Sequence, residues 1–172
     1  MQHFLRTFLD IVLWRRGPQD LPASALLVWL TLAAYVLVSV VQLALLNEPG
    51  VIWFVFVIVD PLMLMAWVWL VLRVYGRSER YVQTVAAVLG TGALLGLVLY
   101  LPLQLLVTSA GSGAASSMVQ FVGLLLVAVF ALVTGRILKL ATDSSLFTGV
   151  AVSLTYFFLI NLLVGMLRGP GT

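Results

Sequence analysis

The sequence has no cysteine and only one histidine, His3. The absence of cysteine excludes disulfides, thiolate metal sites and cysteine nucleophiles. Because the lone imidazole lies near the N-terminus, a serine hydrolase would have no base in the apolar part of the chain. The apolar segments also lack the grouped ligands of a metal site and the paired carboxylates of an aspartyl dyad. We therefore predict that the protein is not an enzyme and that it holds no cofactor and no metal.

Charge is almost as scarce, since 9% of the residues are charged whereas 63% are hydrophobic. A soluble domain carries about 25% charged residues, which cover its surface. Lipid must therefore surround most of this chain. The net charge of +3 comes from basic residues that stand in small groups between apolar runs and form no stripe. This distribution predicts the lipid bilayer as a partner and excludes a nucleic acid.

Five long apolar segments occupy most of the chain, and each is close to or above the roughly 20 residues that cross a bilayer. We predict an all-α integral membrane protein whose bundle covers residues 23–168, with transmembrane helices at about 25–46, 51–74, 81–107, 117–140 and 146–167. A tight turn at 47–50 and a small-residue loop at 108–116 connect two pairs of spans. Oxygens of Thr142, Asp143 and Ser144 are expected to cap the last helix. Residues 169–172 form a short outer tail.

Residues 1–22 are predicted to form an interfacial amphipathic helix and a turn. Helical spacing places a polar set on one side (His3, Arg6, Thr7 and Asp10) and apolar side chains on the other. Such a helix is too short to span and lies in the membrane interface. Arg6, Arg15 and Arg16 are expected to contact lipid headgroups, each contributing about 1 kcal/mol near an anionic leaflet.

The basic residues also predict the orientation, because cytoplasmic loops carry an excess of Lys and Arg. Of the nine Lys and Arg residues, only Arg168 falls on the opposite side from Arg6, Arg15, Arg16, Arg73, Arg77, Arg80, Arg136 and Lys139. With five spans, the N-terminus is expected in the cytoplasm and the C-terminus outside. The charge asymmetry and the lack of a targeting peptide favour a bacterial inner membrane.

Asp60 is the foremost candidate for a functional residue. It lies about nine residues into the second span, hence roughly 13 Å deep at 1.5 Å per residue. A carboxyl group there costs about 2.5 to 3.5 kcal/mol on insertion scales. Asp60 is either a proton or cation site or a structural group that bonds to backbone freed by Pro61, which removes a helix donor.

Other polar and small residues within the spans have two interpretations each. Arg136 either snorkels to the headgroups or pairs with Asp60. Gly92 and Gly96 form a GxxxG face, used for packing inside the bundle or for a homodimer. Residues at the outer ends of the spans either make separate packing contacts or line an outward cavity beside Pro102; these are Gln42, Gln104, Gln120 and Asn161.

Two long stretches carry a family resemblance. Residues 68–106, VWLVLRVYGRSERYVQTVAAVLGTGALLGLVLYLPLQLL, run from a span through a basic turn into a Gly-rich helix with a proline. Residues 124–163, LLLVAVFALVTGRILKLATDSSLFTGVAVSLTYFFLINLL, run from a span through a second basic turn into the last helix. In these stretches the chain resembles the bacterial form of the Yip (Ypt-interacting-protein) family, although the Asp-Leu-x-Gly-Pro element of eukaryotic members is absent. The resemblance implies a non-enzymatic membrane protein; eukaryotic members act with small GTPases and with one another in vesicle traffic.

These observations predict a scaffold, assembly factor or accessory subunit of a membrane complex. Its partner would be another membrane protein or a second copy of the chain, because little of the chain lies outside the bilayer. The alternative is a small ion or solute transporter or channel that uses Asp60 at a proline-broken helix.

Overall fold

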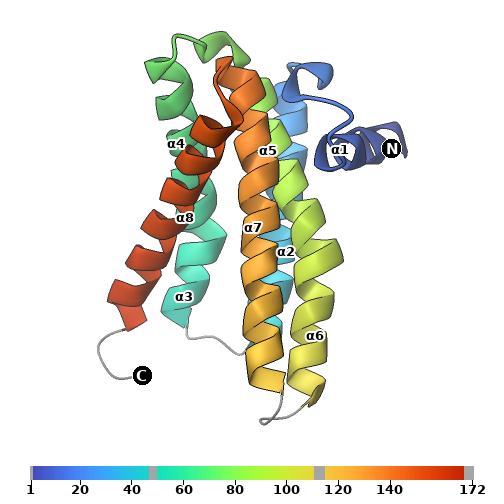
Figure 1. The fold of residues 1–172 in the computed structure, drawn as a ribbon, viewed down its shortest axis with the longest axis vertical. Coiled ribbons are helices and arrows are strands. Elements are labelled where there is room, and N and C mark those ends of the chain that lie inside the picture. The colour runs from blue at the N-terminus through green and yellow to red at the C-terminus, as the bar shows by residue number, and fades with distance from the viewer. Residues whose placement is uncertain (1, 47–49, 111–114, 169–172) are drawn as a thin grey trace.

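The computed structural model describes residues 2–46, 50–110 and 115–168, and every element in these ranges is a helix (Figure 1). Side chains are described for residues 6–45, 50–105 and 121–167. The predicted turn at 47–49, the middle of the predicted loop at 111–114, the tail at 169–172 and the side chain of Gln120 lie outside this description.

Five helices of the described part are long and apolar enough to cross a membrane, which confirms the predicted all-α, five-span architecture. The first span is α2 (Ala25–Leu46). The second joins α3 (Gly50–Phe54), η2 (Val55–Val59) and α4 (Asp60–Val74). The third joins α5 (Tyr81–Leu95), η4 (Gly96–Tyr100) and α6 (Leu101–Ala110). The fourth and fifth are α7 (Ala115–Thr142) and α8 (Leu146–Arg168). Short helices precede the first and third spans: α1 (Gln2–Val12), η1 (Pro18–Asp20) and η3 (Ser78–Arg80).

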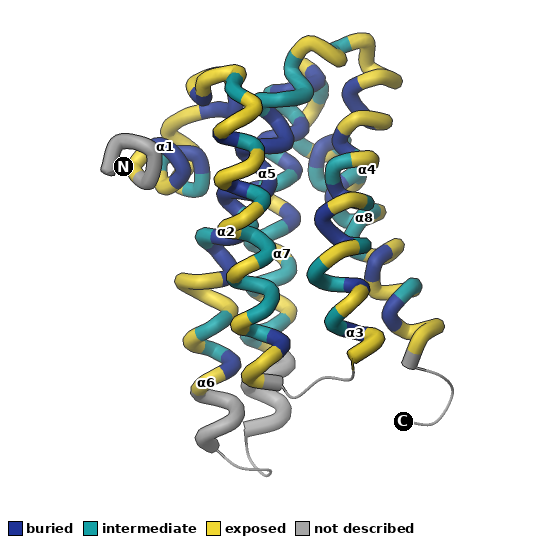
Figure 2. The backbone as a smooth tube through the Cα atoms, turned by 180° about the vertical axis from the view of Figure 1, so that it is seen from behind, coloured by how far each residue is buried: buried dark blue, intermediate teal, exposed yellow. Residues whose placement is uncertain are grey.

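The third span forms the centre of the bundle. In its most apolar stretch 61% of the residues are buried, against 17% in the first and fifth spans. Figure 2 shows the buried residues gathered in and around α5, toward the end of the bundle that carries α1. α5 packs along α2, and α7 packs along α8. The small side chains of Ala86 and Ala87, both fully buried, let neighbouring helices approach α5 closely.

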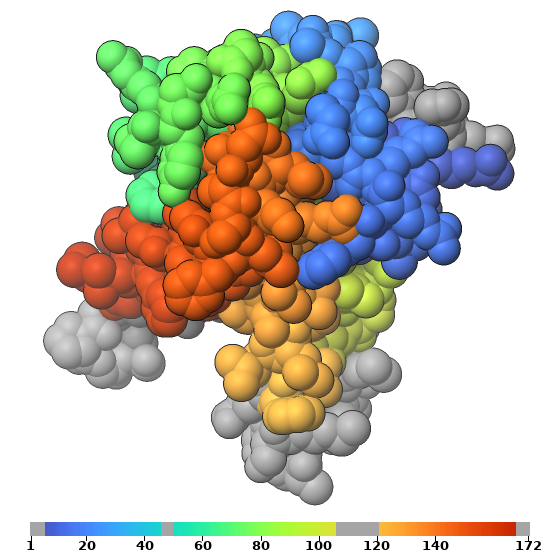
Figure 3. Space-filling model, turned by 45° about the horizontal axis from the view of Figure 1, so that its top comes forward, coloured from blue at the N-terminus to red at the C-terminus, as the bar shows by residue number. Residues whose placement is uncertain are grey.

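Most of the described basic residues lie at one end of the bundle, here called the basic end. It consists of residues 13–24, 75–80 and 143–145, together with the adjoining ends of α4 and α7, and it stands at the top of Figure 1. Figure 3 brings this end forward and shows the three segments meeting over the ends of the long helices.

The N-terminal helix α1 packs against the bundle and does not lie apart from it. Its Phe8 and Ile11 side chains are buried in the main core, and the ring of Phe8 occupies the space where Gly90 of α5 lacks a side chain. Thr7 is buried as well, contrary to its predicted place on the polar side. The helix ends at Val12, and Trp14 then adopts a left-handed φ of 65°, which cannot continue a right-handed helix. Its position in the membrane interface stays a prediction.

The second span is continuous, so the prediction of a proline-broken helix is wrong. Between α3 and α4 the chain makes a wider π-helical turn, in which the N–H of Asp60 donates to the carbonyl of Val55, five residues back. Pro61, which has no backbone N–H to donate, follows directly. Because the turn before it is wider, the helix accommodates the proline and continues without a break. The third span repeats this pattern, with Leu101 donating to Gly96 immediately before Pro102.

The cap of the last helix also differs from the prediction. The hydroxyl of Ser145, and not an oxygen of Thr142, Asp143 or Ser144, accepts the N–H of Thr148 at 3.1 Å. Thr142 instead donates its hydroxyl to the Leu138 carbonyl within α7. A side-chain oxygen must stand immediately before the first helical residue to reach the third helical N–H, and only Ser145 does so.

Candidate functional site

A cavity of about 490 Å³ lies inside the bundle, partly open to the outside, and all five spans line it. Its wall is mostly apolar, with side chains such as Leu64, Val127 and Phe130. A few polar groups interrupt that wall, chief among them Asp60 and Gln104. Size and lining are those of a small-molecule site, which typically measures about 300 to 1,000 Å³ and combines an apolar wall with few polar groups.

The Asp60 carboxyl group is held by two tyrosines from different spans. It is 4% exposed and stands at the start of α4, directly after the π-helical turn. The hydroxyl of Tyr35, on α2, donates to Oδ2 at 2.6 Å. The hydroxyl of Tyr156, on α8, lies 2.5 Å from Oδ1 and 2.9 Å from the Asp60 backbone carbonyl. Three helices thus meet at one carboxyl group.

The hydroxyl of Tyr156 has one proton but two acceptors within reach. If the carboxyl group is ionised, both tyrosines donate to it, and distances of about 2.5 to 2.7 Å are typical of an O–H donor to a carboxylate. If Oδ1 carries a proton, it donates to the Tyr156 oxygen, and Tyr156 donates to the Asp60 carbonyl. The same heavy-atom arrangement therefore satisfies both protonation states.

Asp60 forms no salt bridge with any side chain in the described ranges. In particular, the predicted pairing with Arg136 is not formed. The Arg136 guanidinium instead lies over the ring of Trp14, 4.9 Å from its centroid, at the basic end. An ionised Asp60 thus has hydrogen-bond donors but no neutralising cation.

Two further polar groups of the cavity wall are buried without a hydrogen-bond partner in the described part of the chain. Gln104 is 6% exposed, and neither its amide oxygen nor its amide nitrogen is bonded. The indole nitrogen of Trp67 is likewise unbonded, and its ring lies 6.3 Å from that of Tyr156. Buried polar groups are usually satisfied, so free groups beside a cavity indicate a place for a ligand or water.

The other predicted residues lie around the same cavity but are already engaged. Gln42 donates to the Gly96 carbonyl at 3.1 Å, and Asn161, which is exposed, donates to the Phe157 carbonyl of its own helix at 2.8 Å. Gly92 and Gly96 face α2, where a Cβ would meet Tyr35 at 3.0 Å, and Val38 and Gln42 at 3.0 Å, respectively. Their contacts are those of packing inside the bundle. Pro61 is buried beside Asp60.

Sequence reasoning did not predict Tyr35 or Trp67 as residues of the site. A signal for Tyr35 was present, because its hydroxyl lies near the middle of the first span, where belt aromatics do not belong. Asp60 lies near the middle of the second span, at a comparable depth. An aromatic hydroxyl and a carboxyl group at one depth in neighbouring spans are natural hydrogen-bond partners.

The predicted headgroup residues lie at or near the basic end. Arg6 and Arg15 are exposed. Arg16 pairs with Asp10 at 3.4 Å and donates to Thr7 at 3.3 Å, so part of its binding capacity is used within the N-terminal segment.

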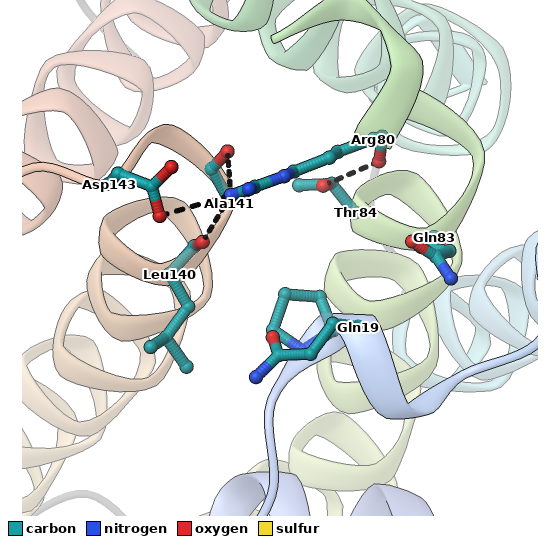
Figure 4. A pocket seen from close by; sticks show the side chains of 8 residues that line it. Gln19, Arg80, Gln83, Thr84, Leu140, Ala141 and Asp143 are labelled. Carbon is teal, nitrogen blue, oxygen red and sulfur yellow. Dashed lines mark hydrogen bonds and ion pairs between the residues drawn. The ribbon is translucent and has the colours of Figure 1, made fainter.

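A second pocket, of about 310 Å³, lies at the basic end (Figure 4). The Arg80 side chain reaches across it and donates to the carbonyls of Leu140 and Ala141 at 3.0 and 3.2 Å, and to Asp143 at 3.1 Å. Gln83 donates to the Leu21 carbonyl at 2.8 Å. These polar groups hold the end of α7 and the 17–21 segment in place, so the pocket is structural.

Comparison with known proteins adds no functional assignment. No family model, no curated protein and no solved structure matches the chain. The resemblance to the Yip family therefore stays a prediction. Within the described residues, no three His, Cys, Asp or Glu side chains are grouped as metal ligands would be.

Proposed function

We propose that this chain is a non-enzymatic integral membrane protein that takes a small, membrane-soluble molecule into the cavity between its spans. The proposal is related to the alternative of the sequence analysis, a small ion or solute transporter or channel that uses Asp60. The observation that carries the proposal is a cavity of about 490 Å³ at membrane depth with a buried carboxyl group and an unbonded amide in its wall. A bundle that served only as a scaffold would gain packing energy by filling such a space.

A scaffold or accessory-subunit role is the second candidate. The feature in its favour is that the connections at the basic end, 75–80 and 143–145, are short. A partner protein would therefore bind mainly to the faces of the helices. The Yip resemblance fits this role as well. A bacterial inner membrane, with the basic end in the cytoplasm, is part of either proposal.

Filling the cavity separates the two candidates. Gly123 of α7 lines the cavity, and a Cβ there meets nothing within 4 Å, so we choose Gly123→Leu to add bulk at the cavity. Gly165 of α8 is a matched control, because it also faces open space but does not line the cavity. The probe is a neutral trifluoromethyl-diazirinyl benzyl alcohol, photoactivated on the protein in nanodiscs and mapped by mass spectrometry.

We expect the neutral probe to label cavity residues of α7 and α8 in the wild type and in Gly165→Leu. In Gly123→Leu this labelling should fall several-fold, while labelling of the lipid-facing surface stays constant. Labelling confined to the lipid-facing surface in all three proteins would refute the proposal and favour the scaffold role.

A further inference from the structure

We infer that the molecule bound in the cavity is a monovalent organic cation, and that it exchanges with a proton on Asp60. The inference rests on the proposed function and specifies its ligand. It follows from three features of the cavity: a carboxyl group without a counter-charge, a hydrogen-bond arrangement that serves two protonation states, and aromatic rings in the wall.

The first feature is the missing counter-charge. Among the described residues of the cavity lining, Asp60 is the one side chain that is charged at neutral pH by its chemical type. Tyr35 and Tyr156 hydrogen-bond to it but carry no positive charge. Burying an unpaired carboxylate is strongly unfavourable, and either a proton or a cation removes that penalty. An anion would face repulsion at the same place.

The second feature is that Asp60 loses a proton without moving its neighbours. In the protonated state Oδ1 donates to Tyr156, which donates to the Asp60 carbonyl; in the ionised state Tyr156 turns its hydroxyl proton to Oδ1. Tyr35 donates to Oδ2 in both states. A cation that enters thus displaces the Oδ1 proton to water, and the carboxylate and the cation then form a neutral pair.

The third feature is the surroundings of Asp60, which favour an organic cation over calcium or magnesium. Calcium requires six to eight oxygen ligands, and magnesium a near-octahedral set. Among the described residues, the side-chain oxygens that hydrogen-bond at Asp60 are those of its own carboxyl group and of two tyrosines. The rings of Trp67 and Tyr156 lie against each other in the wall, and such rings attract ammonium groups and pack against apolar substituents.

Within the part of the lining that the structure describes, no other charged group competes with Asp60. α2 contributes Tyr35, α8 contributes Tyr156 and η4 contributes Tyr100, all neutral at ordinary pH, whereas the lining residues of α5 and α7 include no titratable side chain. Arg136 and Lys139 of α7 are not part of the lining. Proton and cation therefore compete for one site.

The test compares three photoprobes that share one diazirinyl benzyl core: a trimethylammonium, the neutral alcohol and a carboxylate. In wild-type protein in nanodiscs we expect the cation to label the cavity at least about tenfold more than the anion, a difference of ~1.4 kcal/mol. Asp60→Asn should abolish this preference. Acidification should reduce labelling by the cation in the wild type but not in Asp60→Asn.

Tyr35→Phe is the second variant, and it keeps the carboxyl group in place. Because Tyr35 donates a hydrogen bond that favours the ionised form, its loss should let the proton displace the cation at a higher pH than in the wild type. Labelling by the neutral alcohol reports whether the cavity of either variant is intact.

The outcomes separate this inference from the proposed function. A cavity labelled by the neutral probe, but with no preference for the cation or with a preference that survives Asp60→Asn, overturns the inference and leaves the proposed function standing. A cavity labelled by none of the three probes overturns both.

Discussion

Asp143, in the turn between α7 and α8, joins two basic side chains from the turn after α4. Its Oδ1 accepts from Arg80 at 3.1 Å, and its Oδ2 pairs with Arg77 at 2.8 Å. Asp143 has a left-handed φ of 55°, so the chain turns sharply here at the end of α7. Arg80 also binds the last carbonyls of α7, which have no partner within the helix.

We predict that this turn makes the stability of the protein depend on pH. The hydrogen bond from Arg80, followed by the nearby charges of Arg80 and Arg77, lowers the pKa of Asp143 below its usual value despite partial desolvation. A lowered folded-state pKa stabilises the fold above the usual carboxyl pKa and loses that contribution as the pH falls through the folded-state value. The thermal midpoint in detergent should therefore fall on acidification more steeply in the wild type than in Asp143→Asn.

Glu79→Gln is the control, because it removes an exposed carboxyl group from the neighbouring turn. Its pH profile should follow that of the wild type. Parallel profiles of the wild type and Asp143→Asn would contradict the proposed role of Asp143.

At the level of helices, the closest approach among the described glycines joins α7 and α8. A Cβ built on Gly135 would lie 2.6 Å from a methyl group of Val150, and a Cβ on Gly149 would collide with the Gly135 carbonyl oxygen. Ser153 adds a hydrogen bond to the Ala131 carbonyl at 3.0 Å. Small residues four positions apart on both helices, Ala131 with Gly135 and Gly149 with Ser153, thus face each other.

We expect Gly149→Ala to force the two helices apart and to lower the free energy of unfolding by about 1 to 3 kcal/mol, the usual effect of overpacking. Gly165→Ala, on the same helix but in open space, should cause no loss. The measurement is unfolding in mild detergent with increasing denaturing detergent. Equal stability of the two variants would show that the contact between α7 and α8 tolerates a methyl group at position 149.

Sequence reasoning did not identify the glycines of the tightest contact between spans. The GxxxG pattern drew attention to Gly92 and Gly96, which pack against α2, whereas Gly135 and Gly149 lie on different spans and form no local motif. The two π-helical turns were also missed. Proline marks where a helix needs adjustment, but whether the chain kinks, breaks or widens depends on its neighbours.

At the scale of the whole molecule, the basic end predicts the orientation in the membrane. The cysteine-free sequence permits single-cysteine variants without further change. Ser78→Cys lies in the exposed turn at the basic end, and Gly50→Cys at the exposed start of α3 at the opposite end. In intact cells a membrane-impermeant maleimide should label Gly50→Cys, and it should label Ser78→Cys only after permeabilisation. The reverse pattern would invert the predicted topology.

The sequence by itself determined the number of spans and their approximate bounds. A run of about 20 apolar residues is a local property, and its length as a helix matches the hydrocarbon core of the bilayer. It also singled out Asp60, since a carboxyl group in an apolar run is conspicuous without any knowledge of its neighbours. α2, for example, has the predicted bounds, and the second span, from the start of α3 to the end of α4, begins and ends within a residue of the prediction.

Only the tertiary structure decided what surrounds that carboxyl group. Its partners Tyr35 and Tyr156 lie 25 and 96 positions away in the chain. Whether their hydroxyl groups reach Asp60 depends on how the spans pack. The spans are apolar on nearly every face, so no stripe of hydrophobic residues specifies which face turns inward. Packing of small residues makes that choice, and here it leaves a cavity beside Asp60.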